Sequence, residues 1–203
     1  MTFIDAPQLS TLYITSLNQI DFDTPQLAQF INCAPTLRAL YEAHVQFDDS
    51  TAGVELHYRT SEFYDLIIKI SCREPDRQLS FVAQVCNSFL SPFSMVEHLN
   101  MYIEHDCLTW KNVAIENTLW SQLLRAFAAV KNLYLSKEIA PDIAAALQEL
   151  VGARITEVLP SLRNIFVEGL RDDPSGSLQE NIWQFCGARR QSGHPITISY
   201  KDL

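Results

Sequence analysis

Residues 130–135 read Val-Lys-Asn-Leu-Tyr-Leu, and this stretch decides the fold. Leu133 and Leu135 are two positions apart, so both side chains lie on one face of a strand. Tyr134 lies between them and points to the other face. Similar frames recur at intervals of 26 to 34 residues, which indicates a repeated structural unit. The other copies begin at Leu9, Leu37, Phe63, Val96 and Leu162.

This spacing is at or just above that of leucine-rich repeats, which have roughly 20–29 residues. Amphipathic helical patterns separate most copies, at 24–31, 77–90, 117–127, 141–159 and 177–186. One such unit cannot bury its apolar face alone, whereas several stacked units can. We therefore predict an α/β fold for residues 1–203, a single irregular leucine-rich-repeat-like solenoid. Its parallel sheet lies on the concave side and its helices on the convex side. We expect the strands that begin at Leu9, Leu37, Val96, Val130 and Leu162 to be neighbours in chain order.

Residues 43–73 depart from this scheme. Three β-like runs, Val45–Phe47, Val54–Tyr58 and Leu66–Ile70, follow one another without a helix, and Asp48–Gly53 is rich in turn formers. We predict a hairpin excursion here. Whether residues 63–70 belong to the main sheet stays open.

The repeat frame also predicts a core. Side chains at the apolar positions of the strands should be nearly fully buried against the helices. These are Leu12, Ile14, Leu99, Met101, Leu133, Leu135, Ile165 and Val167.

Composition excludes several classes of function. The formal net charge is −9, which disfavours nucleic-acid binding because phosphate backbones attract Lys and Arg, and which leaves room for a basic partner. The sequence has no apolar run of about 18 residues, so no membrane association is expected. The 5 cysteines are scattered and form no C-x-x-C pair, which favours a reducing intracellular compartment, cytoplasmic or nuclear.

No catalytic or metal site is predicted, and no cofactor. Neither a G-x-S-x-G elbow, a glycine-rich phosphate loop nor an H-E-x-x-H pair is present. Glu104, His105 and Asp106 are adjacent, which favours a solvated loop over a metal site because ligands must converge. Cys86 and Cys186 lie on apolar helical stripes and are expected in the core. The Arg189–Arg190 pair fits a helix C-terminus, where positive charge is favourable.

One repeat position offers a candidate binding surface. The residue between the two apolar strand positions should face away from the core, and it is aromatic in four of five copies. Strand propensity explains the residue type, and an aromatic ladder for a partner explains the alignment. We weigh the two alternatives equally. The predicted ladder is Tyr13, Tyr41, Asn100, Tyr134 and Phe166, and its predicted polar rim is Arg38, Lys131 and Arg163.

Several segments resemble the leucine-rich-repeat region of F-box-like proteins from mushroom-forming fungi. The resemblance covers most of the chain and is best over residues 77–200. It implies a substrate-recognition surface of a cullin-RING ubiquitin ligase. It does not extend to the F-box itself, so a ligase linker is expected only if an upstream F-box exists. The segments that carry it are 32–37, 127–138, 144–152, 158–162, 187–190 and 194–196.

The leading functional hypothesis is a protein–protein interaction module related to F-box adaptors, with an unknown protein partner. One alternative is a repeat scaffold without a ubiquitin link. The other is a small α/β enzyme with an unrecognised site, although no enzyme activity is expected. No polar cap precedes Leu9, which favours a longer natural product.

Overall fold

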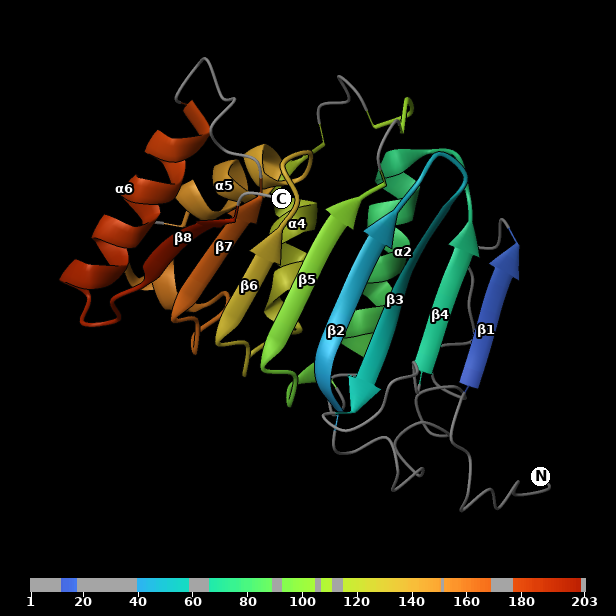
Figure 1. The fold of residues 1–203 in the computed structure, drawn as a ribbon, viewed down its shortest axis with the longest axis horizontal. Coiled ribbons are helices and arrows are strands. Elements are labelled where there is room, and N and C mark those ends of the chain that lie inside the picture. The colour runs from blue at the N-terminus through green and yellow to red at the C-terminus, as the bar shows by residue number, and fades with distance from the viewer. Residues whose placement is uncertain are drawn as a thin grey trace.

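The computed structural model describes residues 12–17, 40–58, 66–88, 93–104, 107–110, 115–150, 152–168 and 177–201. Its strands form one open, mostly parallel sheet, and helices cover one face of that sheet (Figure 1). The strands are β1 (Leu12–Leu17), β2 (Leu40–Phe47), β3 (Thr51–Tyr58), β4 (Leu66–Ser71), β5 (His98–Ile103), β6 (Asn132–Leu135), β7 (Asn164–Glu168) and β8 (Thr197–Lys201). The helices are α2 (Pro75–Ser88), α4 (Asn117–Arg125), α5 (Ala140–Gln148) and α6 (Ser177–Gln191), with a 3-10 helix η2 (Gly152–Thr156).

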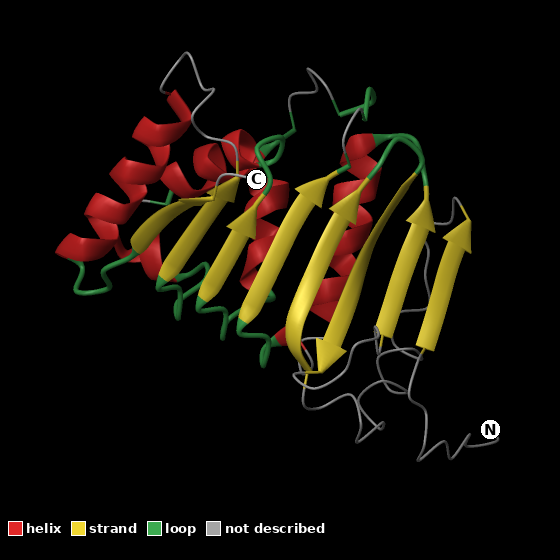
Figure 2. Cartoon of the chain, in the orientation of Figure 1, coloured by secondary structure: helices red, strands yellow, loops and turns green. Residues whose placement is uncertain are grey.

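Five strands on one side of the sheet lie in chain order. β2, β5, β6, β7 and β8 are parallel neighbours, and a described helix precedes each of the last four along the chain. Figure 2 shows these helices on the same face of the sheet. The prediction of parallel neighbours in chain order is therefore confirmed for β2, β5, β6 and β7.

The prediction that the first two repeat strands are neighbours is wrong. The sheet order is β1-β4-β3-β2-β5-β6-β7-β8, so β3 and β4 separate β1 from β2. The cause is a tight turn after Phe47, in which the Asp48 carboxylate accepts hydrogen bonds from the backbone N–H groups of Ser50 and Thr51. This turn folds β3 back antiparallel on the free edge of β2, and β4 adds antiparallel to β3.

The hairpin excursion is thus part of the main sheet. β1 pairs in parallel with β4, which places residues 66–70 in the main sheet, whereas residues 63–65 lie outside the described residues. The predicted run Val45–Phe47 is the end of β2, a strand that begins at Leu40.

The core fills the space between the sheet and the helices. Side chains along β5, β6 and β7 alternate between buried and partly exposed positions. The predicted core side chains of these strands are all buried, from 0% to 3% exposed, whereas those of Leu12 and Ile14 lie outside the described residues. Aromatic rings pack beneath the sheet, with Phe47 and Trp110 centroids 4.5 Å apart.

The helix predictions hold for α2 and α4 and need one correction. The helix expected at 141–159 ends at Gln148, and η2 follows it. Gly152 favours this break because glycine is a poor helix former. The apolar stripe remains buried through Leu150, Ile155 and Val158, so the tighter turn preserves the core contacts. The helix expected at 24–31 lies outside the described residues.

Candidate functional site

The sheet has one face that no described helix covers, and we call it the bare face (Figure 2). Side chains reach it from every second residue of each strand. Strand register aligns them in rows that run across the sheet. The middle row consists of Glu55, His44, Asn100, Tyr134, Phe166 and Ser199, on β3, β2, β5, β6, β7 and β8.

Aromatic rings stack along the bare face. The Tyr134 and Phe166 rings lie 4.5 Å apart with an interplanar angle of 9°. His98 stacks on the other side of Tyr134 at 6.2 Å, and Tyr41 lies 4.5 Å from His98. The ring spacing follows from the distance between neighbouring strands, about 4.8 Å. Part of the predicted aromatic ladder therefore exists as a stack across four strands.

One member of the predicted ladder, Tyr41, lies outside the middle row. His44, not Tyr41, aligns with Asn100. The pairing of β2 with β3 is irregular between Leu40 and Glu42, next to Tyr41. Tyr41 still contributes to the stack through His98. Tyr13 pairs with Ile67 of β4, and Ile67 pairs with Glu55, so Tyr13 lies in the same row, four strand steps, roughly 19 Å, from Asn100. The side chain of Tyr13 lies outside the described residues.

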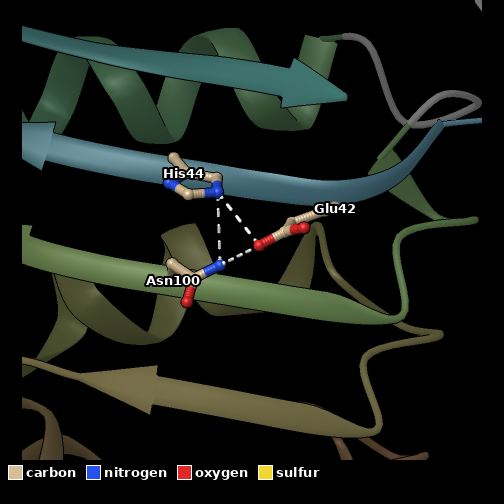
Figure 3. Close-up of polar contacts among 3 residues, drawn as sticks. All are labelled: Glu42, His44 and Asn100. Atoms are coloured by element: carbon tan, nitrogen blue, oxygen red, sulfur yellow. Dashed lines mark hydrogen bonds and ion pairs between the residues drawn. The ribbon is translucent and has the colours of Figure 1, made fainter. Parts of the chain in front are cut away.

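Glu42, His44 and Asn100 form a polar cluster on β2 and β5 (Figure 3). The Asn100 amide donates to Glu42 Oε1 at 2.6 Å, and His44 Nε2 lies 3.0 Å from the same oxygen. His44 Nε2 is also 3.4 Å from the Asn100 nitrogen. The tautomer of His44 that carries its hydrogen on Nε2 fits this geometry best. In that tautomer both His44 Nε2–H and the Asn100 amide donate to the Glu42 carboxylate. The carboxylate thereby fixes two neighbouring polar side chains.

A second polar row lies nearer the amino ends of the strands. Asn164 donates to the Asn132 side-chain oxygen at 2.7 Å, and the Asn132 amide lies 3.3 Å from His98 Nε2.

Burial raises the pKa of the neighbouring Tyr134 hydroxyl, and the negative charge of Glu42 adds to this effect. The Tyr134 hydroxyl therefore stays neutral near pH 7 and can both donate and accept hydrogen bonds.

The β3–β4 side of the bare face is occupied by a charged network. Glu55 is 4% exposed and pairs with Lys69 Nζ at 2.6 Å. Gln46 donates to the same Glu55 oxygen at 2.8 Å, and the Tyr102 hydroxyl donates to Gln46 at 2.6 Å. These groups satisfy one another, so the less constrained part of the bare face lies over β5, β6 and β7.

A groove of about 650 Å³ lies at the carboxyl ends of β5, β6 and β7, and we call it the end groove. The stacked rings of Tyr134 and Phe166 form one side of it. Its other lining residues include Asn100, Tyr102, Glu104, Ser136 and Glu168. Most of its lining residues lie on β5, β6 and β7. These strands belong to three successive repeats, so the groove forms where the repeats stack.

The predicted polar rim is only partly described. Lys131 and Arg163 lie just before β6 and β7, at the amino edge of the sheet. Lys131 pairs with Glu97 at 2.6 Å, and Arg163 is exposed. Arg38 lies outside the described residues. The rim residues therefore lie at the opposite edge of the sheet from the end groove.

The Arg189–Arg190 pair does more than complement a helix dipole. Arg190 is exposed, but Arg189 is 0% exposed and donates to four backbone carbonyls. The acceptors are the carbonyl oxygens of Ile155, Leu159, Pro160 and Leu162. Arg189 thus joins α6 to the segment that leads into β7, a structural role that the sequence pattern did not indicate.

Cys86 and Cys186 pack with the core, as expected. Cys86 is fully buried and Cys186 is partly buried. Burial raises the pKa of both thiols, that of Cys186 to about 11, so both stay protonated near pH 7. Within the described ranges, no three His, Cys, Asp or Glu side chains come together in a way that could hold a metal ion. His105 and Asp106 lie outside those ranges.

The bare face offers stacked rings, carboxamides and carboxylates in a fixed arrangement. Such a surface can form hydrogen bonds and apolar contacts with a partner at the same time. None of the described helices is long and apolar enough to cross a membrane. Comparisons with known proteins found no family model, no curated protein and no solved structure that matches this chain.

Proposed function

We propose that this chain is a leucine-rich-repeat-like solenoid that binds another protein through its bare face. In this proposal the bare face over β5, β6 and β7 is the binding surface. Tyr134 and Phe166 are its apolar centre, and Asn100 and Asn132 are polar contacts beside them.

The observation that carries the proposal is the stack of rings on a face that no described helix covers. The side chains of Tyr134 and Phe166 are only partly buried, whereas those of the residues before them on the same strands, Leu133 and Ile165, are fully buried. Strand propensity accounts for one exposed aromatic residue but not for four rings in contact across four strands. Aromatic residues at the centre of a protein interface often contribute most of the binding energy.

The resemblance to F-box-like proteins favours one kind of binding protein. It supports a role as the substrate-recognition region of a ubiquitin ligase adaptor. A repeat scaffold without a ubiquitin link would use the same bare face. Mass spectrometry of the proteins bound to the full-length product tests the difference, because an adaptor predicts a cullin and its linker among them.

A pair of single substitutions tests the binding surface. Tyr134→Ala removes a ring from the stack, whereas Trp183→Ala removes an exposed ring from α6 on the helical side. Proteins captured from a mushroom-forming fungus lysate by the wild-type chain are purified, and their dissociation constants are measured with each variant. We expect Tyr134→Ala to weaken binding by at least about fivefold, which corresponds to about 1 kcal/mol. Trp183→Ala should leave binding unchanged.

A thermal melt of each variant separates binding from folding. Loss of one stacked pair costs about 0.5–1.5 kcal/mol beyond area burial, so Tyr134→Ala should remain folded at 25 °C. Unchanged binding by a folded Tyr134→Ala variant would contradict the proposal. Loss of binding in Trp183→Ala alone would move the interface to the helical side.

A further inference from the structure

One small residue, Ser136, lies among longer side chains in the lining of the end groove. Met101 aligns with Leu135 and Leu135 with Val167, so Ser136 follows between Tyr102 and Glu168 at the carboxyl ends of the strands. A tyrosine and a glutamate flank it, and a serine side chain is much shorter than either. Ser136 lines the end groove together with Tyr134 and Phe166.

Ser136 also supplies an unsatisfied polar group. The residue is 7% exposed, and its hydroxyl has no hydrogen-bond partner among the described residues. Its backbone is fully used, since the N–H donates to Met101 and the carbonyl accepts from Ala140. A buried hydroxyl without a partner costs about 1–3 kcal/mol. The residue lines the end groove but its hydroxyl oxygen is closed to solvent, so a donor group in the groove recovers this energy only when the serine side chain rotates toward it.

The charge of the end groove favours a cation. Among the residues that the structure describes, the charged lining residues are Glu104 and Glu168. Lys201 of β8 pairs with Glu168 in the sheet, and its side chain lies outside the described residues. The chain as a whole has a formal net charge of −9, which strengthens attraction of a positive group. The rings of Tyr134 and Phe166 add an apolar wall, against which the methylene groups of a long side chain can pack.

We infer that the end groove takes a lysine or arginine side chain of the protein partner. The aliphatic stem lies along the rings, and the charged head lies between Glu104 and Glu168 with Ser136 beneath it. This inference rests on the proposed function, because it assigns the chemistry of the partner at the same face.

A random peptide library tests the inference without a known partner. Phage that display random 12-residue peptides are selected on the intact chain, and the recovered peptides are synthesised with a fluorescent label. Affinity is measured by fluorescence polarisation for the wild-type chain and for Tyr134→Ala. Peptides whose binding Tyr134→Ala weakens should share a Lys or Arg at one position. Replacing that Lys with norleucine, or that Arg with citrulline, should weaken binding at least tenfold.

Matched protein variants test the groove itself. A Glu104→Gln/Glu168→Gln variant should weaken the same peptides at least tenfold and should reduce the dependence of binding on salt. The control, Glu74→Gln/Glu180→Gln, removes the same charge from two exposed sites on helices or their ends. It should change affinity by less than about twofold. Ser136→Ala should weaken binding severalfold with little change in salt dependence.

The outcomes separate this inference from the proposed function. If Tyr134→Ala weakens the peptides but norleucine and citrulline bind as well as Lys and Arg, the inference is overturned and the binding face stands. If both glutamine pairs weaken binding equally, the attraction is a property of the net charge and the inference is again overturned. If no selected peptide depends on Tyr134, both proposals fail.

Discussion

Arg189 is the strongest single test of how the last repeat is held together. Its guanidinium is buried beside the Phe185 ring, 5.9 Å from the ring centre. The substitution Arg189→Met keeps the length and the apolar stem of the side chain but removes every donor. Arg190→Met, one residue later, is the matched control because Arg190 is exposed.

The expected cost follows from the four hydrogen bonds. Two of them, to Ile155 and Pro160, are 3.1 and 3.2 Å long, and those to Leu159 and Leu162 are longer, at 3.3 and 3.5 Å. A hydrogen bond from a charged group contributes about 1.5–3 kcal/mol, and the cost of burying the guanidinium offsets part of the sum. We expect a net loss of about 2–4 kcal/mol.

Thermal and chemical unfolding measure this loss. For a chain of this size, about 1 kcal/mol lowers the melting temperature by roughly 2–4 °C, so Arg189→Met should melt roughly 4–16 °C lower. Arg190→Met should change the free energy of unfolding by less than about 0.5 kcal/mol. Arg189→Lys should fall between them, because one ammonium cannot reach all four carbonyls. Equal stability of the Met variants at 189 and 190 would refute this account of the buried guanidinium.

Three further predictions concern the core and its buried polar groups. Leu133→Ala should lower the free energy of unfolding by about 2–5 kcal/mol in a denaturant titration, because it empties a fully buried position of the central strands; a loss under 1 kcal/mol would mean that the repeat register is wrong. Gln78→Leu should cost about 2–4 kcal/mol, because Gln78 hydrogen-bonds three groups, two of them backbone carbonyls, while exposed Gln84→Leu should cost almost nothing. Cys86 and Cys186 should resist iodoacetamide at pH 8, because burial raises the pKa of both thiols and keeps them protonated; rapid alkylation of Cys86 in the folded chain would contradict its burial.

The part of the fold that repeats with regular spacing could be predicted from the sequence. In β5, β6 and β7 aliphatic or methionine side chains alternate with polar or aromatic ones, so the period of two identified both the buried side chains and the residues opposite them. The position of β1 could not be predicted in this way. It depends on which strand edge the β2–β3 turn leaves free, and that is a property of the turn rather than of the repeat.

The binding surface was predicted in outline only. Tyr134, Phe166 and Asn100 follow from the alternation, but the pairing of β2 with β5 places His44 where Tyr41 was expected. His98 was missed as a member of the stack, although it lies two residues before Asn100 and so on the same face.

Two other features were hidden by their residue type. Ser136 lies two residues after Tyr134, so its face could have been inferred, but its lack of a partner depends on three-dimensional packing. Arg189 was explained by the helix dipole alone, and its burial was not expected because charged residues are rarely buried.

The most direct test of the proposed binding face is hydroxyl-radical footprinting of the chain alone and in complex with its captured partner. Oxidation of each aromatic side chain reports its exposure to solvent. The account predicts that oxidation of Tyr134 and Phe166 falls several-fold in the complex while that of Trp183 on α6 does not change. Protection of Trp183 with unchanged oxidation of Tyr134 and Phe166 would contradict it.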